Sequence, residues 1–244
     1  MNYQLPKAIL FDLDDTILAS TTLAGQIWCT VSKKFADRVE QYDSKQLFTA
    51  IEIERALYWS NPERHRKGRL NPSESAKEVA LWALTRLGVE DIVIASEMGE
   101  AYQAGRDEQI HPFPGAIDLL SRLLEIGVKL ALITNGNGPL QWGKITKFGL
   151  ESYFDCIVIE DQFGFGKPDE RVYRHALGHL GSSPQDTWMI GDNLEWEVVV
   201  PKKLGIKGIW VDNGGDGLPE NMNVKPDKII GGLSELLKDF NNCS

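Results

Sequence analysis

The segment FDLDDTIL places three acidic side chains, Asp12, Asp14 and Asp15, within four positions. They stand at the end of an apolar run, Lys7–Leu13, whose composition is that of a strand covered on both faces. Ionised carboxylates at this spacing repel one another, so they are stable together only in a solvated turn or beside a positive charge. The segment therefore indicates either an exposed turn or a site that receives a cation.

Further polar residues follow the next apolar runs of the chain. They are Thr134, Asn135 and Gly136 at the end of the second predicted strand, Lys167 after the third, and Asp192 at the end of the fourth, with Glu197 just beyond it. The carboxyl ends of parallel strands meet at one edge of a sheet, where ligands bind in open α/β folds. A gathering of oxygen ligands without partners is costly and suits a hard divalent cation, so we expect magnesium there.

Apolar runs and amphipathic stretches alternate along most of the chain. The predicted strands are Lys7–Leu13, Val128–Thr134, Asp155–Glu160, Thr187–Asp192 and Lys207–Asp212. The predicted helices between and after them are Ala116–Ile126, Pro139–Phe148, Asp169–Leu180, Glu195–Leu204 and Gly232–Phe240. Alternation of this kind predicts a doubly wound α/β fold with a mostly parallel sheet.

The interval between the first two strands departs from this alternation. Helical periodicity recurs there in Leu23–Val39, Ser44–Trp59, Ser73–Leu87 and Ile92–Gly105. A connection of this length is too long for a plain loop in a compact domain. We expect an inserted helical domain at 18–109, with the α/β core formed by 1–17 and 110–244.

Four segments, ILFDLDDTIL, LITNG, GKPDERVY and MIGDNLEWE, occur in this order at the predicted strand ends. Together they resemble the motifs of the haloacid dehalogenase-like (HAD) superfamily, in its helical-cap phosphatase branch. The resemblance implies a Rossmann-like core, a cap domain and magnesium-dependent hydrolysis of a small phosphorylated metabolite. The stretch TNGNGPLQWGKITKFGLESYFD is similar to sugar-phosphate and nucleotide phosphatases, including the acylneuraminate-9-phosphatase group.

The resemblance also implies roles for the acidic residues. Asp12 would be the nucleophile that forms an aspartyl-phosphate. Asp12, the backbone carbonyl of Asp14 and Asp192 would bind magnesium. The Asp14 side chain would protonate the leaving alkoxide and would have to begin protonated. Asp15 would be a turn residue, and Thr16 would satisfy the loop backbone.

The remaining motif residues would bind the phosphoryl group. Thr134 and the amides of Asn135 and Gly136 would hold the transferring oxygens, with Pro139 at the first turn of the helix that follows. Lys167 would neutralise the phosphoryl group and restrain Asp12.

One position departs from the family pattern, because Glu197 stands where the family has an aspartate. We expect Glu197 to contact metal-bound water from the outer shell. The alternatives are a degenerate site in a binding or scaffold protein, a phosphomutase, or a dehalogenase. Asp14 disfavours a dehalogenase, and the absence of histidine from Ile17–Trp28 disfavours a phosphomutase.

The stretch NPERHRKGR, at 61–69, is strongly basic in a chain whose net charge is −9. It is interpreted as a connector between two cap helices, bounded by Asn61-Pro62 and Asn71-Pro72. Either it is simply solvated, or Arg64 and Arg66 bind a second anionic group of the substrate.

The bulk composition limits the other partners. A net charge of −9 and a pI near 5.0 disfavour nucleic acid as a partner. No apolar run approaches the length of a membrane span, and three scattered cysteines form neither a disulfide framework nor a metal-binding pattern. We expect a cytoplasmic monomer or homodimer that acts on a small molecule.

Overall fold

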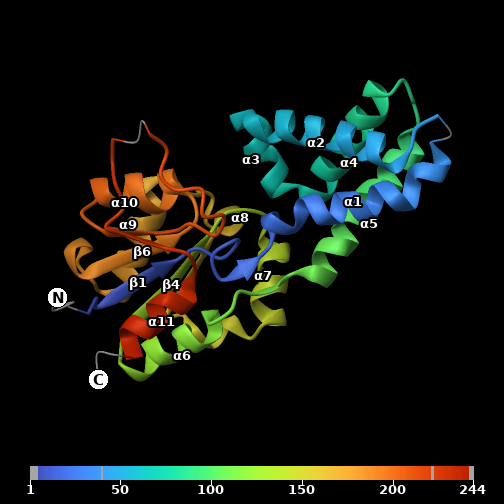
Figure 1. Cartoon of the computed structure of the whole chain (residues 1–244). Helices are drawn as coiled ribbons and strands as arrows, with labels where there is room; N and C mark the ends of the chain where they lie inside the picture. The colour runs from blue at the N-terminus through green and yellow to red at the C-terminus, as the bar shows by residue number, and fades with distance from the viewer. Residues whose placement is uncertain (1–4, 40, 221–222, 242–244) are drawn as a thin grey trace. The chain divides into compact units, whose positions relative to one another are not determined.

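The computed structural model describes residues 5–39, 41–220 and 223–241. The chain folds into two compact units. One, the α/β unit, comprises Met1–Ala19 and His111–Ser244, and the other, the helical unit, comprises Ser20–Ile110. Figure 1 shows both along the chain.

The α/β unit contains a six-stranded parallel sheet. This confirms the predicted fold class, an α/β fold with a mostly parallel sheet. Its strands are β1 (Ala8–Phe11), β4 (Lys129–Thr134), β5 (Cys156–Ile159), β6 (Thr187–Gly191), β7 (Lys207–Val211) and β8 (Lys228–Ile230), in the order β5-β4-β1-β6-β7-β8. The short strand β8 was not predicted. Two further short strands, β2 (Leu18–Ala19) and β3 (His111–Pro112), pair antiparallel where the chain leaves and re-enters this unit.

Strand β1 lies between β4 and β6, and all four of its residues are buried. Phe11 pairs with Leu132 on β4 and with Ile190 on β6. The residue after Phe11 therefore lies beside Gly191, the last residue of β6. This register brings the acidic segment, the end of β4 and the end of β6 to one edge of the sheet.

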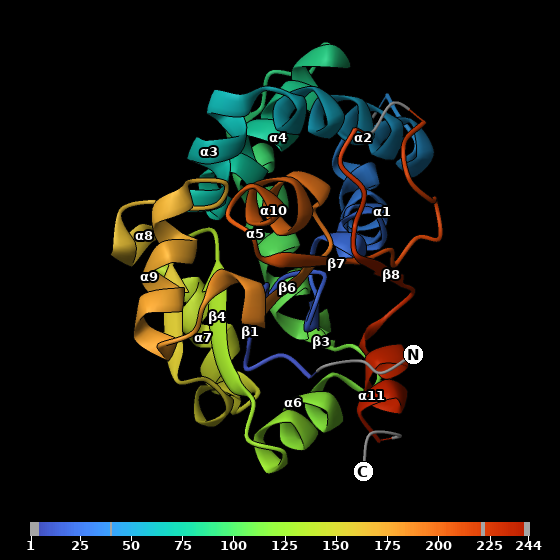
Figure 2. The same cartoon turned by 90° about the vertical axis from the view of Figure 1, so that its left-hand side faces the viewer.

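Helices cover both faces of the sheet. They are α6 (Ala116–Glu125), α7 (Gly138–Lys147), α8 (Glu160–Phe163), α9 (Glu170–Leu180), α10 (Val200–Lys203) and α11 (Leu233–Asn241). In Figure 1, α9 and α10 lie above the sheet and α6 and α11 below it, and Figure 2 shows the same unit turned by 90°. A single helix was predicted over Glu195–Leu204, but the chain forms a π-helix at Leu194–Val199 followed by the short α10.

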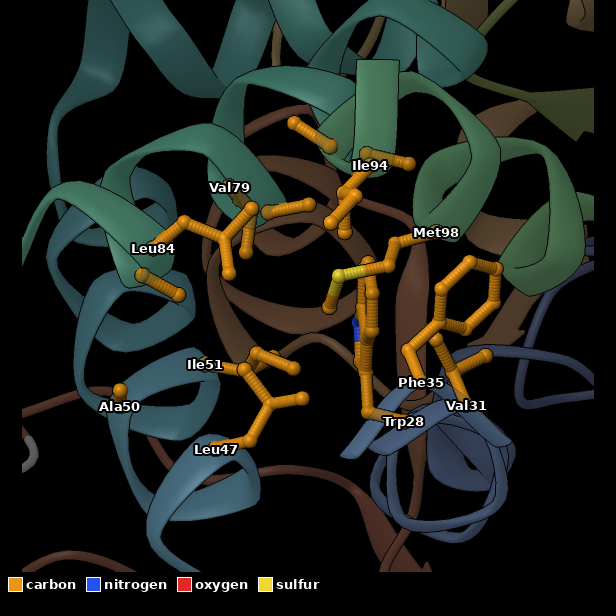
Figure 3. Packing of buried hydrophobic residues seen from close by; sticks show 14 of the residues in the cluster. Trp28, Val31, Phe35, Leu47, Ala50, Ile51, Val79, Leu84, Ile94 and Met98 are labelled. Atoms are coloured by element: carbon orange, nitrogen blue, oxygen red, sulfur yellow. The ribbon is translucent and has the colours of Figure 1, made fainter. Parts of the chain in front are cut away.

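The helical unit packs around its own apolar core. Its helices are α1 (Ala24–Phe35), α2 (Ser44–Ser60), α3 (Pro62–Leu70), α4 (Pro72–Arg86) and α5 (Ile92–Gln109), with 3-10 turns at Thr21–Leu23 and Ala36–Arg38. Figure 3 shows the buried side chains that α1, α2, α4 and α5 contribute. Trp28 belongs to this core, because it is fully buried and stacks on Tyr102 with ring centroids 4.3 Å apart.

The basic stretch in the helical unit is a helix and not the connector that the sequence suggested. Asn61 caps α3 by accepting a hydrogen bond from the amide of Arg64, and Pro62 occupies the first turn. The sequence interpretation took the Asn61-Pro62 pair as a helix break. It is both the end of α2 and the start of α3.

Cys29 and Cys156 are free thiols, and Cys243 lies outside the described residues. Within the part of the chain that the structure describes, no helix has the length and apolar character needed to cross a membrane.

Candidate active site

Asp12 is the first residue beyond β1. Its amide donates to the carbonyl of Ile190 at 3.0 Å, which continues the ladder between β1 and β6. Its carboxylate accepts two side-chain hydrogen bonds, from Lys167 Nζ to Oδ1 at 2.5 Å and from Thr16 Oγ1 to Oδ2 at 3.1 Å. Thr16 was expected to satisfy the loop backbone, and this was wrong. Its hydroxyl fixes the Asp12 carboxylate instead.

The turn after Asp12 depends on Asp15. This residue has φ of 60°, in the left-handed region that aspartate tolerates better than most side chains, and its amide donates to the carbonyl of Leu18 at 2.7 Å. The Asn213 side chain donates to the Asp15 carbonyl at 2.5 Å. Asp15 is thus a turn residue whose backbone is tied to the loop after β7.

Lys167 is fully buried, and its ammonium bridges two carboxylates. Nζ lies 2.5 Å from Asp12 Oδ1 and 2.8 Å from Glu197 Oε1. Burial disfavours the charged ammonium, but the two carboxylates outweigh this, and the pKa of Lys167 lies above its ordinary value. Asn135 fixes the backbone of Lys167: its Oδ1 accepts from the Lys167 amide and its Nδ2 donates to the Lys167 carbonyl, both at 2.7 Å.

Glu197 is fully buried, and both its carboxylate oxygens accept hydrogen bonds. Oε1 accepts from Lys167 and Oε2 from the amide of Asn193 at 2.8 Å. Burial raises the pKa of Glu197 to about 7, against the opposing effect of Lys167. The sequence led us to expect a contact to metal-bound water, whereas the contacts observed are to Lys167 and Asn193.

A glycine makes room for Glu197. A Cβ at Gly191 would lie 2.1 Å from Glu197 Cγ and 3.0 Å from Asp12 Cβ. Glu197 is placed by the π-helix Leu194–Val199, which Asn193 caps through hydrogen bonds from the amides of Glu195 and Trp196. The longer side chain at this position therefore fits a locally widened helix turn and an unobstructed strand end.

Asp192 lies close enough to Asp12 and Glu197 to be affected by their charges. Burial, followed by these two carboxylates, raises the pKa of Asp192 to about 9. Burial also raises the pKa of Asp12, against the effect of Lys167. Among the described residues, no donor forms a hydrogen bond to the Asp192 side chain. The Lys167 ammonium thus contacts Asp12 and Glu197, whereas its charge opposes the rise in the pKa of Asp192 only weakly.

The loop after β4 holds its amides toward acidic side chains. The Gly136 amide donates to Glu160 Oε2 at 3.0 Å, and the Gly138 amide donates to Asp161 Oδ2 at 2.8 Å. We expected the Gly136 amide to hold a phosphoryl oxygen, but in this structure Glu160 occupies it. Thr134 is buried and lies beside Gln141, whose Nε2 is 2.6 Å from Thr134 Oγ1.

Asp14 is held by two residues of α7. Lys144 Nζ lies 2.6 Å and 2.8 Å from its two carboxylate oxygens, and Gln141 Nε2 lies 2.8 Å from Oδ2. We expected Asp14 to begin protonated, but an ammonium this close favours the ionised carboxylate. The sequence interpretation assigned no role to either residue of α7.

Arg64 and Arg66 belong to α3 of the helical unit. Both are exposed, and the guanidinium of Arg64 lies 4.7 Å from the centre of the Trp82 ring. A role for either arginine in binding substrate stays a prediction.

Four residues around the site were missed. They are Gln141, Lys144, Glu160 and Asn213. Glu160 closes the third apolar run, so reading every strand end for polar residues would have found it. The other three contact the acidic segment across more than a hundred residues of chain, and local patterns give no signal for such pairs.

Comparison with known proteins identifies the family. Residues 6–205 match the haloacid dehalogenase-like hydrolases. The chain belongs to this family. Among its curated relatives, the phosphoserine phosphatase of Thermus thermophilus is 30% identical to this haloacid dehalogenase-like hydrolase, over 94% of this chain and 97% of that protein. The glyceraldehyde 3-phosphate phosphatase of Methanopyrus kandleri is 25% identical, over 96% and 99%.

Solved structures have the same fold. A HAD-hydrolase of Bacillus subtilis, determined with bound magnesium, has a TM-score of 0.72 and 23% identity, and the match covers 98% of this chain and 100% of that one. This agreement supports an α/β core with a helical insertion, as expected for a haloacid dehalogenase-like hydrolase.

Proposed function

We propose that this haloacid dehalogenase-like hydrolase is a magnesium-dependent phosphatase that acts on a small phosphorylated metabolite through an aspartyl-phosphate on Asp12. The observation that supports this most directly is the position of the Asp12 carboxylate. It lies at the end of the central strand, held by Lys167 and Thr16, with Asp192 beside it. The curated relatives that are phosphatases support the reaction class of phosphoric monoester hydrolysis.

The reaction consists of two displacements at phosphorus. In the first, Asp12 Oδ attacks phosphorus and the bond to the leaving alkoxide breaks. Asp14 gives that alkoxide a proton, which it takes up when the anionic phosphate binds beside it, because a nearby negative charge favours the protonated carboxyl group over the effect of Lys144. In the second, water attacks phosphorus, the bond to Asp12 breaks, and Asp14 takes a proton from the water. The proton that Asp14 loses in the first step is thus restored in the second.

Lys167 has two tasks in this scheme. Its ammonium orients the Asp12 carboxylate, and it stabilises negative charge on the transferring phosphoryl group. Glu197 and Asn135 fix the ammonium and the backbone of Lys167 in turn. The Thr134 hydroxyl and the Asn135 amide bind phosphoryl oxygens.

The residues present fit a magnesium ion. Asp12, Asp192 and the backbone carbonyl of Asp14 would hold it, an all-oxygen set completed by water. Within the described residues no group of three acidic, histidine or cysteine side chains is arranged to hold a metal, so the proposed set consists of two carboxylates and one backbone carbonyl. The Asp192 carboxylate also lacks a hydrogen-bond donor among these residues. When bound, magnesium would offset the charge of the carboxylates and of the phosphoryl group.

The helical unit is proposed to serve as the cap domain, which restricts the enzyme to small substrates. The substrate class is a sugar phosphate, a nucleotide or a similar phosphorylated metabolite. The experiment that tests this is phosphate release from a panel in the presence of magnesium. The panel contains phosphoserine, glyceraldehyde 3-phosphate, N-acylneuraminate 9-phosphate and pyrimidine 5′-nucleotides. Release from one of these well above the rate for the others supports a metabolite phosphatase, and no release from any of them contradicts it.

A non-catalytic binding protein is the second candidate, because Glu197 replaces the usual aspartate. The buried contacts of Glu197 with Lys167 and Asn193 favour an intact site over a degenerate one. Turnover of p-nitrophenyl phosphate that requires magnesium would exclude the binding protein.

A further inference from the structure

Helix α7 presents two side chains to Asp14. Gln141 and Lys144 are three residues apart and so lie on one face of the helix. The ammonium of Lys144 contacts both oxygens of the Asp14 carboxylate, at 2.6 and 2.8 Å, and Gln141 Nε2 contacts Oδ2 at 2.8 Å. Both oxygens of Asp14 are therefore oriented by the same helix.

Gln141 also connects Asp14 to the phosphate-binding loop. Its side chain is buried, with 3% of its surface exposed. The same Nε2 lies 2.6 Å from Thr134 Oγ1 and 2.9 Å from the carbonyl of Asn135. A buried amide group is stable only where its hydrogens find acceptors. Here the acceptors are Asp14, after β1, and Thr134 and Asn135, at the end of β4.

The start of α7 is itself fixed. Asn137 caps the helix by accepting from the amide of Leu140 at 3.1 Å, and Asp161 accepts from the amide of Gly138 at 2.8 Å. The Lys144 and Asp14 side chains are 13% and 23% exposed, so solvent and salt weaken their ion pair less than a surface pair. Groups on a capped helix hold their partners more accurately than groups on a loop.

We propose that Gln141 and Lys144 are positioning residues that orient the Asp14 carboxylate for proton transfer to the leaving oxygen and from water. This inference rests on the proposed function, in which Asp14 is the acid and base. Neither residue forms a bond to phosphorus in that scheme. Without them the Asp14 side chain gains rotamers, and the fraction of encounters with a correctly aligned carboxyl group falls.

The test compares substrates that differ in their need for a proton. The variants are Lys144→Met and Gln141→Met, with Lys144→Arg as the conservative variant and Lys147→Met as the control. Lys147 lies on the same helix but is exposed, and its ammonium lies over the Phe148 ring. For each variant, kcat/KM is measured with p-nitrophenyl phosphate, which has a good leaving group, and with phenyl phosphate, which has a poorer one.

Lys144→Met and Gln141→Met should each lower kcat/KM about tenfold or more with phenyl phosphate and less than about threefold with p-nitrophenyl phosphate. Lys144→Arg should restore most of the activity, and Lys147→Met should behave as the wild type. The inhibition constant of inorganic phosphate should stay within about twofold of the wild type, since positioning of a proton donor does not bind phosphate.

Two results would overturn the inference. Equal losses with the two substrates would mean that the residues support the site only structurally. A phosphate inhibition constant that rises in step with the loss of kcat/KM would make Lys144 a phosphate ligand. Thermal unfolding of each variant shows whether it is folded. If Lys144→Met does not fold, Lys144→Arg and Gln141→Met still test the inference.

Asp14→Asn separates failure of this inference from failure of the proposed function. If Asp14→Asn itself shows no preference between the substrates, Asp14 is not the acid and base, and the proposed function is wrong at that point. If Asp14→Asn is selective but the α7 variants are not, only the positioning role is wrong. If all are selective, Lys144→Met should add less than about twofold in the Asp14→Asn background, because coupled residues are not additive.

Discussion

Glu197 and Lys167 form a buried pair in which Glu197 Oε1 lies 2.8 Å from Lys167 Nζ, and neither side chain is exposed to solvent. Lys167 also contacts Asp12, so the charge of the residue at position 197 affects the proposed nucleophile through one ammonium. The glutamate that departs from the family pattern is thus part of the arrangement that holds Lys167.

Glu197→Gln should lower both stability and activity. The amide nitrogen of glutamine would face the Asn193 amide, which needs an acceptor, or Lys167, which needs one too. We expect a loss of about 1–3 kcal/mol in the free energy of unfolding and a fall in kcat of about tenfold. Denaturant unfolding and p-nitrophenyl phosphate turnover measure the two effects. Glu195→Gln, an exposed carboxylate in the same π-helix, is the control and should change neither. Wild-type stability of Glu197→Gln would show that the pair contributes little.

Gly191→Ala should damage the site directly. The added Cβ would meet Glu197 Cγ at 2.1 Å, so Glu197 or the strand end must move. We expect the free energy of unfolding to fall by about 2 kcal/mol or more and kcat to fall as well, because overpacking a buried site is costly. Gly178→Ala is the matched control: it lies inside α9 with open space around it and should stabilise the protein by about 0.5–1 kcal/mol. Thermal unfolding of the two variants measures these opposite changes in stability. A Gly191→Ala variant as stable as the wild type would show that the strand end adapts without cost.

Arg64 and Arg66 allow a comparison within one helix. Arg64→Ala loses the contact with Trp82 and should destabilise the protein by about 0.5–1 kcal/mol, whereas Arg66→Ala should not. If these arginines bind a second anionic group, KM for a doubly anionic substrate should rise at least tenfold in one of the variants, since such contacts contribute about 1.5–3 kcal/mol. Hydrolysis of p-nitrophenyl phosphate should hardly change. Wild-type KM values in both variants with every substrate of the panel would leave the arginines as solvated residues of α3.

The sequence predicted the sheet and the position of the acidic segment because these depend on local signals. An apolar run followed by Asp12 gives both a buried strand and a polar strand end, and the same holds at Thr134 and Asp192. Strand β8 has only three residues, too few for its pattern to stand out from the loop before it. Helix α3 was missed because it contains almost no apolar residues, and its caps, Asn61 and Pro62, also read as a break.

The side-chain partners of the site were less predictable. Gln141 and Lys144 contact Asp14 across 127 and 130 positions of the sequence, and only the folded chain brings these residues together. The contact of Thr16 with Asp12 is local, but a threonine in a turn can bond equally well to the backbone. Glu197 was noticed as a departure from the pattern, yet its contact with Lys167 required the register of β6 and the π-helix.

The central claim is that Asp12 is the nucleophile of a magnesium-dependent phosphatase. The measurement that tests it most directly is turnover of p-nitrophenyl phosphate by the wild type and by Asp12→Asn, each with magnesium and each after removal of metal by EDTA. Asp12→Asn keeps the size of the side chain and should remain folded by thermal unfolding. We expect the wild type to turn over p-nitrophenyl phosphate only when magnesium is present. We expect the kcat of Asp12→Asn with magnesium to be lower than that of the wild type by about a thousandfold or more. Wild-type turnover that persists in EDTA, or an Asp12→Asn variant that retains more than about a thousandth of the wild-type kcat, would contradict the account.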